Sequence, residues 1–329
     1  MKVVVTGGAG FIGSHLVDQL LNKGYEVLII DNFCTGLLNN IDQTSNKVSI
    51  INHDIRIPIP NSMFDNCSIV FHLAALADIV PSIESPVDYL STNVQGTVNV
   101  LEAARASNIK RVIYTASSTC YGVTSNFPTS ENDQIAPTFP YALSKYLGEL
   151  VFFHWLTLYG LKGLSLRLFN VYGPRARTSG NYGAVMGVFL AQKIAQKPFT
   201  VVGDGNQVRD FTYVSDVVQA FILAGESQLT GEAINIGTQN PQSVNRLADL
   251  LGGKVEFIPK RPGEPDITHA DITKAKKLLD WEPQITFEEG VRNVLSEINM
   301  WKDAPLWSKE DILKATSTWF QYLGKNETK

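Results

Sequence analysis

Residues 2–13 read KVVVTGGAGFIG, and this stretch decides the fold. A β-branched run, Val3–Thr6, ends on a turn with glycines at positions 7, 10 and 13, and a helical pattern follows. Glycine permits a tight turn, leaves no side chain where a pyrophosphate approaches, and lets the helix pack closely on the strand. The first N–H groups of such a helix attract phosphate. The stretch predicts a dinucleotide site; a purely structural turn is the alternative.

Short apolar runs alternate with helical patterns over the first 170 residues. The runs are apolar almost throughout, which is typical of strands covered by helices on both faces. This alternation predicts an α/β fold, a Rossmann-type doubly wound parallel sheet. We expect strands at Val3–Thr6, Glu26–Ile30, Val48–Ile51, Ile69–His72, Val112–Thr115 and Gly163–Leu168 and helices at Ile12–Asn22, Val87–Ala106 and Tyr141–Tyr159.

The texture changes after Asn170, where Gly and Pro become frequent between short elements. We expect residues 1–170 to form the dinucleotide-binding domain, with some later segments returning to it. Residues 171–301 are predicted to form mainly a smaller α/β substrate domain, and residues 302–329 a C-terminal helical extension. An amphipathic pattern over 303–323 predicts a helix in this extension, capped near Ser308 and packed on the protein, with a lid or partner surface as the alternative.

Composition excludes several classes of protein. The chain has 329 residues, 44% of them hydrophobic and 18% charged, which is ordinary for a globular protein. A net charge of -4 leaves no basic field for nucleic acid. Three widely spaced cysteines, no signal-peptide pattern and no apolar run long enough for a membrane predict a cytoplasmic protein with reduced thiols and no membrane partner. Five scattered histidines predict no metal site.

Asp31 ends the second expected strand, 18 residues after Gly13. A carboxylate there can accept hydrogen bonds from the ribose hydroxyls of an adenine dinucleotide and repels a 2′-phosphate. No arginine is close in sequence to reverse that preference, so we predict NAD as the cofactor. The alternative is an aspartate that only caps the following turn.

A phenol and an ammonium lie four residues apart in the stretch Tyr141-Ala142-Leu143-Ser144-Lys145, on one face of an expected helix. Tyrosine has a pKa of about 10, and a neighbouring Lys⁺ together with the positive charge of an oxidised nicotinamide lowers it. Tyr141 is therefore a candidate acid/base. Ser117 ends the fifth expected strand, where a parallel sheet presents groups to ligands, and its hydroxyl is placed to bind a reacting oxygen. An exposed helix face and a structural serine turn are the alternatives.

Taken together, these residues resemble the extended short-chain dehydrogenase/reductase family, especially its nucleotide-sugar epimerases and dehydratases. The resemblance runs from Lys2 to about Ile298. It rests also on Asp54-Ile55, His72-Leu73-Ala74-Ala75, Asn93-Val94-Gln95-Gly96-Thr97, residues 167–174 (RLFNVYGP), residues 203–211 (GDGNQVRDF) and Arg261-Pro262-Gly263-Glu264.

The resemblance implies a role for each matching residue. The catalytic residues would be Ser117, Tyr141 and Lys145, with Lys145 tuning the tyrosine and holding the nicotinamide ribose. The NAD-binding residues would be Gly7, Gly10, Phe11, Ile12, Gly13, Asp31, Asn32, Asp54, Ile55, Leu73, Ala74, Ala75, Asn93, Thr115, Tyr141, Lys145, Phe169 and Val171. The substrate-binding residues would be Ala77, Ser117, Ser118, Thr119, Tyr141, Asn170, Thr200, Val201, Arg209, Arg261 and Glu264. The arginines suit a diphosphate, which guanidinium groups bind in a bidentate manner.

One departure from the family separates its activities. Its 4,6-dehydratases and its UDP-glucuronate decarboxylases carry an acidic residue directly after the hydroxyl position, whereas Ser118 and Thr119 follow Ser117 here. This favours NAD-dependent epimerisation of a nucleotide sugar, at C4 of a UDP-hexose through a 4-keto intermediate. The alternatives are a dehydrogenase, a reductase, or an epimerase acting at another carbon or on a GDP- or CDP-sugar. A redox-inactive NAD-binding regulatory protein is the alternative from another class.

Two further expectations concern surfaces. The helices over 87–106 and 141–159 resemble those that form a four-helix dimer interface in this family, and Phe152, Phe153, Trp155 and Leu156 supply apolar surface for a homodimer. Arg175 and Arg177 either meet a carboxylate on the sugar or lie on a solvated loop, and we favour the loop.

Overall fold

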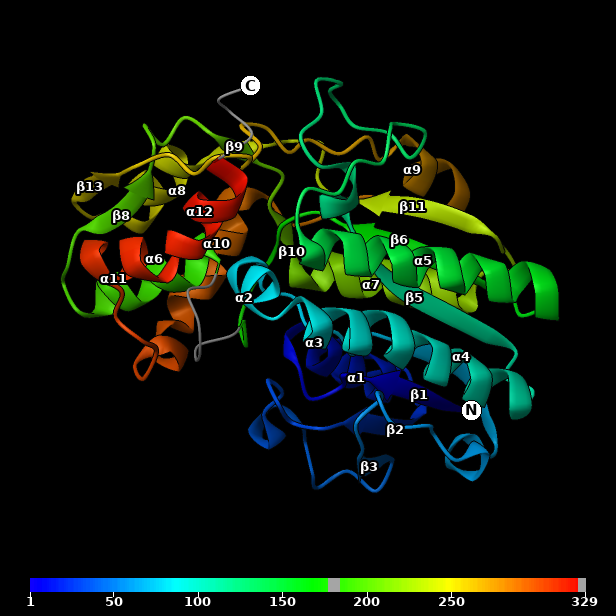
Figure 1. Cartoon of the computed structure of the whole chain (residues 1–329). Coiled ribbons are helices and arrows are strands. Elements are labelled where there is room, and N and C mark those ends of the chain that lie inside the picture. Colours follow the sequence, from blue (N-terminus) through cyan, green and yellow to red (C-terminus); the bar gives the residue numbers. More distant parts are fainter. Residues whose placement is uncertain (177–183, 325–329) are drawn as a thin grey trace.

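A computed structural model describes residues 1–176 and 184–324 of the chain. Two lobes lie side by side in it: a large one built on the N-terminal half, and a smaller one that holds most of the C-terminal half (Figure 1). Arg177 lies outside the described residues.

Within the described residues, the large lobe is built on seven parallel strands in the order β11-β6-β5-β4-β1-β2-β3. The order reverses direction between β1 and β4, the arrangement of a doubly wound sheet, so the predicted fold class is confirmed. The strands are β1 (Lys2–Thr6), β2 (Glu26–Asp31), β3 (Val48–Asn52), β4 (Cys67–His72), β5 (Arg111–Ser117), β6 (Gly163–Leu168) and β11 (Glu232–Ile236).

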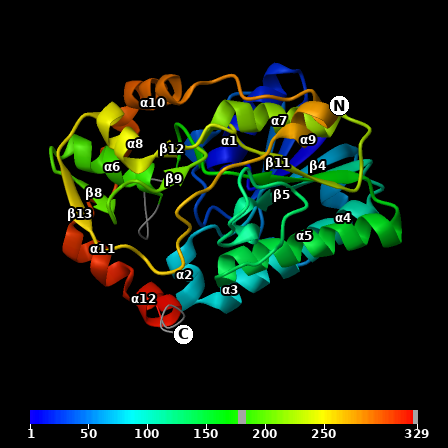
Figure 2. The same cartoon turned by 90° about the horizontal axis from the view of Figure 1, so that it is seen from above.

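Helices cover both faces of this sheet, which explains the continuously apolar strands. Val3 and Val5 pack into the core beside α1 (Phe11–Asn22) and α7 (Val214–Glu226), whereas Val4 packs into a second core beneath α4 (Gly96–Ala106) and α5 (Pro140–Tyr159). Figure 2 shows α1 and α7 on one side of the sheet and α4 and α5 on the other. Successive strand residues point to opposite faces, so each one meets a different helical layer.

The predicted helix Val87–Ala106 is interrupted. The chain forms α2 (Ile79–Glu84), α3 (Pro86–Leu90), a π-helical turn at Ser91–Gln95 and then α4 (Gly96–Ala106). π-Helical turns inside helices are frequent at functional sites. The predicted helix Tyr141–Tyr159 is present as α5 (Pro140–Tyr159), with a proline at its start and Gly160 in the left-handed conformation at its end.

The surface predicted from α5 needs a correction. Phe152 and Leu156 are buried in the core rather than presented on the surface, while Phe153 and Trp155 are half-buried. Phe152 stacks on the Tyr114 ring of β5, which is why its side chain turns inward.

The small lobe is made of short strands and helices beside the carboxyl ends of the large sheet (Figure 1). Its strands pair as β8 with β13, β9 with β12 and β7 with β10. They are β7 (Val171–Tyr172), β8 (Phe199–Val202), β9 (Val208–Arg209), β10 (Thr212–Tyr213), β12 (Gln242–Ser243) and β13 (Val255–Ile258). The remaining helices are α6 (Val185–Ile194), α8 (Val244–Leu251), α9 (Thr273–Leu279), α10 (Phe287–Ser296), α11 (Lys309–Ala315) and α12 (Ser317–Leu323), and short helical turns lie at Leu38–Asn40, Asn61–Phe64, Ser118–Tyr121 and Ile298–Trp301.

The single helix predicted over 303–323 is wrong in extent. Helix α11 begins after Ser308, whose side chain and that of Asp311 form a reciprocal capping box. Thr316 leaves the helical backbone conformation and separates α11 from α12. The predicted cap at Ser308 is therefore confirmed, and the helix it starts is only seven residues long.

Candidate active site

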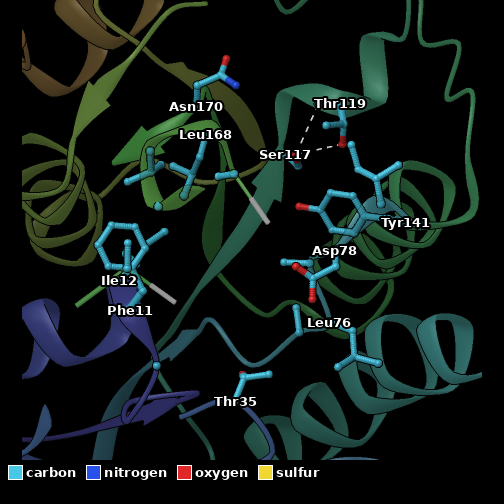
Figure 3. Close-up of a pocket in the computed structure, with 18 of the residues that line it drawn as sticks. Phe11, Ile12, Thr35, Leu76, Asp78, Ser117, Thr119, Tyr141, Leu168 and Asn170 are labelled. Atoms are coloured by element: carbon cyan, nitrogen blue, oxygen red, sulfur yellow. Dashed lines mark hydrogen bonds between the residues drawn. The ribbon is translucent and has the colours of Figure 1, made fainter. Parts of the chain in front are cut away.

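A cavity of about 940 Å³ lies at the carboxyl ends of the large sheet and receives walls from both lobes. This is where open α/β sheets bind ligands, and its volume is at the upper end of the range for ligand pockets. Figure 3 shows Phe11 and Ile12 of α1 on one side of this space and Ser117 and Tyr141 on the other. The cavity thus connects the glycine turn with the candidate catalytic residues.

The glycine turn is held by close backbone contacts. Gly7 has φ +71°, and a Cβ there would lie 2.7 Å from the backbone nitrogen of Ala74; a Cβ on Gly13 would lie 2.1 Å from the Gly7 carbonyl oxygen. Gly10 caps α1 without a side-chain hydrogen bond. The first N–H groups of α1 are therefore bordered by bare backbone at the cavity wall, which suits a pyrophosphate.

Asp31 lies at the end of β2 with its carboxylate at the cavity. It accepts hydrogen bonds from the backbone N–H groups of Ala9 (3.0 Å) and Phe33 (2.8 Å). Burial raises the pKa of the Asp31 carboxyl, and the two backbone bonds oppose this. The carboxylate is thus fixed beside the glycine turn, where the ribose of a dinucleotide is expected.

An arginine does lie near this end of the cavity, although none is close to Asp31 in the sequence. Arg56 lines the cavity and pairs with Asp54 at 2.6 Å. Asn32 donates to the same carboxylate at 3.2 Å, and these bonds, with that of Arg56 the largest, lower the pKa of Asp54 to about 2. Since its guanidinium is engaged by Asp54, Arg56 does not offer the unpaired fork that a 2′-phosphate needs.

Ser117, Thr119 and Tyr141 form the reacting end of the cavity. The hydroxyls of Ser117 and Thr119 are 2.9 Å apart, and the Thr119 N–H donates to the Ser117 oxygen at 3.3 Å (Figure 3). The phenol oxygen of Tyr141 points into the cavity from the same side, next to Ser117 (Figure 3). These groups can hold one hydroxyl or carbonyl oxygen between a proton donor and a proton acceptor.

Burial governs the charges of the Tyr141 and Lys145 pair. It raises the pKa of Tyr141, against a hydrogen bond with Ser117 that lowers it, and it lowers the pKa of Lys145 to about 7, against the charge of Glu149. The expected lowering of the tyrosine pKa is therefore not present in the protein alone. It requires the second positive charge, that of an oxidised nicotinamide, on which the expectation also relied.

Asn93 occupies the π-helical turn and does not line the cavity. Its amide accepts from the Leu76 N–H and donates to the Leu76 carbonyl and to the Ser144 hydroxyl, each at 2.9 Å. It therefore joins the loop after β4 to the helix that carries Tyr141. The backbone at Asn93 forms a π turn, and the hydrogen bonds of the buried amide hold this loop and helix in position relative to one another.

The substrate half of the cavity carries two arginines around one carboxylate. Arg209 pairs with Glu264 at 2.9 Å, and Arg261 lies 3.7 Å from the other oxygen of the same carboxylate. Two positive charges and one negative charge leave the cluster at +1, which suits a diphosphate. Glu264 Oε2 is buried without a hydrogen-bond partner among the described residues, so this cluster has an acceptor left for a ligand.

Most of the predicted site residues line this one cavity. They are Gly7, Gly10, Phe11, Ile12, Gly13, Asp31, Asn32, Asp54, Ile55, Leu73, Ala74, Ala75, Ala77, Thr115, Ser117, Ser118, Thr119, Tyr141, Lys145, Asn170, Val171, Thr200, Arg209, Arg261 and Glu264. Three predicted residues do not: Asn93, as described above, and Phe169 and Val201, whose side chains are buried in the hydrophobic core. Val201 does not line the cavity because its neighbour Thr200 takes the cavity side of β8, and adjacent strand residues face opposite ways.

Several residues that line the cavity were not predicted from the sequence. Asp78 precedes α2 and lies beside Tyr141 in the cavity (Figure 3). Phe139 caps the helix of Tyr141, and Trp307 and Trp319 come from the C-terminal extension. An acidic residue four positions beyond Ala74 was a usable signal, whereas nothing in the local pattern relates the two tryptophans to Tyr141, which lies 166 and 178 residues before them.

Two further kinds of site are absent from the described residues. Among residues 1–176 and 184–324, His, Cys, Asp and Glu side chains form no group of three that could hold a metal ion. No described helix combines the length and apolarity needed to cross a membrane.

The comparisons with known proteins agree on one family. The family model described as GDP-mannose 4,6 dehydratase matches residues 4–294. The chain is 39% identical to a putative UDP-glucose 4-epimerase of Methanocaldococcus jannaschii, over 89% of this chain and 97% of that protein. The crystallised UDP-N-acetylglucosamine 4-epimerase of Methanobrevibacter ruminantium, in complex with UDP-N-acetylmuramic acid, is similar with a TM-score of 0.86 and 34% identity, over 91% of this chain and 97% of that one. The UDP-glucuronic acid 4-epimerase of Bacillus cereus, in complex with UDP-glucuronic acid and NAD, is similar with a TM-score of 0.85 and 32% identity, over 91% of this chain and 99% of that one.

Proposed function

The chain belongs to the GDP-mannose 4,6 dehydratase family of extended short-chain dehydrogenases/reductases, and we propose that it is an NAD-dependent epimerase acting at C4 of a UDP-hexose. The observation that carries the proposal is the convergence of three groups of residues on one cavity. They are the glycine turn with Asp31, the catalytic trio Ser117, Tyr141 and Lys145, and the arginine pair of the small lobe.

The residues of the large lobe fit NAD. The uncapped start of α1 accepts a pyrophosphate, and Asp31 accepts hydrogen bonds from the adenosine ribose. Thr115 Oγ1 is buried at the cavity wall without a hydrogen-bond partner among the described residues, an atom that a ligand can satisfy. When bound, NAD⁺ supplies the acceptor, and later the donor, of the hydride at C4 of the sugar.

Tyr141 and Ser117 then perform the proton chemistry. Ser117 hydrogen-bonds the oxygen on C4, and Tyr141 as phenolate takes its proton, leaving a 4-keto sugar. Tyr141 returns the proton to the same oxygen when the sugar is reduced on its opposite face. Lys145 beside Tyr141 favours the phenolate when it carries its charge. Net composition is unchanged, because the product is the C4 epimer of the substrate.

A second candidate activity rests on Asp78. The sequence argues against a dehydratase because no acid follows Ser117, but the carboxylate of Asp78 lies at the same end of the cavity, near Tyr141 (Figure 3). A carboxylate there could move a proton at a carbon next to C4 and so support elimination of water from C5 and C6. We rank this activity second, because Ser118, directly after Ser117, holds the position where the dehydratases of the family carry their acid.

NMR of the sugar product decides between the two. Purified protein without added cofactor is incubated with UDP-glucose, UDP-N-acetylglucosamine or UDP-glucuronate, and the anomeric signals are followed. A new anomeric signal of the C4 epimer supports the proposal and identifies the sugar. A new methyl signal with loss of the C6 hydroxymethyl group supports dehydration instead, and Asp78→Asn should then abolish it. No change in any sample after addition of NAD would overturn epimerisation of these substrates.

We also propose a homodimer through α3 and α5. Apolar side chains stay exposed on these two neighbouring helices: Val87 is 74% exposed, Leu150 45% and Leu143 41%. Such a surface favours burial against a second copy. Sedimentation velocity should give twice the mass of the chain, and Leu150→Glu should shift it to the monomer.

The thiols support a cytoplasmic location. Cys34, Cys67 and Cys120 are all free, and the last two are buried. Proteins of oxidising compartments usually carry disulfides.

A further inference from the structure

The C-terminal extension folds back onto the cavity. The family model ends at residue 294, and the chain continues into α11 and α12. Both figures of the whole chain show α12 beside α2, at the boundary between the lobes (Figures 1 and 2). Ile312 and Trp319 are almost fully buried, so these helices are an integral part of the molecule rather than a loose tail.

Trp319 is the central residue of this arrangement. It lines the cavity while only 3% exposed. Its indole N–H donates to the Pro262 carbonyl at 2.6 Å, and the Arg261 guanidinium lies 5.7 Å from its ring centre. An indole face attracts a guanidinium, and the hydrogen bond fixes the adjacent backbone. Trp319 therefore holds the loop that presents Arg261 to the cavity.

The same ring reaches the catalytic helix. Trp319 lies 6.1 Å from Phe139 between ring centres, and Phe139 stacks on Tyr141 at 6.3 Å with nearly parallel planes. An aromatic row thus runs from the arginine loop of the small lobe to the catalytic tyrosine of the large lobe. Such contacts within a packed interior resist independent movement of the residues that they join.

Two polar contacts secure the extension at either end. The Thr318 hydroxyl donates to Glu84 of α2 at 3.2 Å. The Trp307 carbonyl accepts from Gln192 at 2.9 Å, and the same amide also holds both the hydroxyl and the N–H of Thr200. The extension is therefore tied both to the helix that follows Asp78 and to the strand end that lines the cavity.

We propose that residues 303–324 form a wall of the nucleotide-sugar site and that Trp319 is a positioning residue for substrate binding. It sets Arg261, which faces the diphosphate, at a fixed distance from Tyr141, which faces the sugar. The ligand class is a nucleoside diphosphate hexose, so the inference rests on the proposed function. The extension consequently governs substrate affinity and sugar preference, with the NAD half of the cavity left unaffected.

The test compares Trp319→Ala with Gln321→Ala, an exposed residue on the same helix. We expect Trp319→Ala to weaken UDP binding by calorimetry and to raise KM for the UDP-sugar, each by about tenfold or more. The change in kcat should be under about threefold, and the NAD content of the purified protein should stay unchanged. The differences in kcat/KM among the UDP-sugars should become smaller. Gln321→Ala should match the wild type in every readout.

A folded, NAD-loaded Trp319→Ala protein with wild-type UDP affinity, KM and sugar preference would overturn the proposal. If that variant does not fold, Trp319→Leu decides by the same readouts, because it keeps apolar volume and loses the indole contacts. UDP binding needs no turnover. The two proposals can therefore fail separately. If the wild-type protein epimerises none of the sugars, but Trp319→Ala still weakens its UDP binding, the proposed function is refuted and this inference stands.

Discussion

The two halves of the cavity are built from different material. On the large-lobe side, the wall at the glycine turn is main chain, shaped by glycines whose replacement would push a Cβ into neighbouring backbone. On the small-lobe side, the wall is side chain: Arg209, Arg261 and Glu264 in one ion-paired cluster, with Trp319 packed behind it.

This difference separates what is fixed from what can vary. A backbone wall recognises groups common to every dinucleotide and tolerates little change, because its shape comes from the path of the chain. A side-chain wall can be altered one residue at a time without moving the strands beneath it. We infer that cofactor use is set by the large lobe and substrate choice by the small lobe and its extension.

The largest effect is expected where the two halves meet. Tyr141→Phe removes the proton acceptor and should lower kcat by roughly 10²- to 10⁴-fold, the range that general acid–base catalysis contributes. NAD content and UDP affinity should remain close to the wild type, because neither half of the cavity is disturbed. Steady-state kinetics with calorimetry measures both, and a variant that keeps more than a tenth of the wild-type rate would remove Tyr141 from the chemistry.

A change in the backbone wall should disable only the cofactor half and the stability of the turn. Gly13→Ala places a Cβ 2.1 Å from the Gly7 carbonyl oxygen, so the turn must open. We expect loss of bound NAD and a melting temperature lower by several degrees, read by absorbance and calorimetry. Gly324→Ala is the control, because its Cβ would be 3.6 Å from Pro262, an ordinary contact. Normal NAD content in Gly13→Ala would contradict a backbone-built site.

A change in the side-chain wall should weaken substrate binding and leave cofactor binding intact. Arg261→Met keeps an unbranched side chain and removes the charge that faces the diphosphate. UDP binding should weaken by roughly 10- to 100-fold, as expected for a lost charge-assisted hydrogen bond, while NAD content stays unchanged. Lys260→Met, at an exposed neighbouring cation, should have little effect. Equal losses of UDP binding in the two variants would indicate a general field rather than a specific arginine.

The smallest effect is on stability and involves Lys145. Burial lowers its pKa to about 7 in the folded protein, whereas the unfolded chain keeps an ordinary value of 10.5. Between these values the unfolded state binds more protons, so stability rises with pH; below about pH 7 the full cost of the buried charge is present. Lys145→Met should therefore raise the free energy of unfolding of cofactor-free protein at pH 6, by on the order of a few kcal/mol at most, and its melting temperature with it.

The advantage of Lys145→Met should shrink as the pH rises from 7 toward 10. Thermal unfolding over this range checks the sign. A variant that is less stable than the wild type at pH 6 would show that the contacts of Lys145 with the Tyr114 ring and Glu149 outweigh its desolvation.

The large lobe was predictable from the sequence because its elements are locally encoded. The apolar runs and the glycine turn placed six strands to within one or two residues of each end, and Pro140 and Gly160 mark the limits of α5. The strand β11 was not predicted, although later segments were expected to return to the first domain. It comes from the irregular half of the chain and completes the sheet only by pairing with β6.

The site was predictable only in part, for reasons of geometry. Residues on matching motifs, such as Asp31 and Arg261, do line the cavity. Val201 does not line it because facing alternates along a strand, and Phe169 does not because the core takes its ring. Trp319 was not predicted because its relation to Tyr141 exists only after folding, whereas Asp78 lies close in sequence to a matching motif and was overlooked.

Isotope labelling tests the central claim most directly. The UDP-hexose that the protein accepts is labelled with deuterium at C4 and incubated without added NAD. The account predicts inversion at C4 with the deuterium kept at C4 of the product, since the hydride leaves and returns within one closed cavity. Inversion with a solvent proton at C4, or deuterium lost to a different carbon, would contradict it.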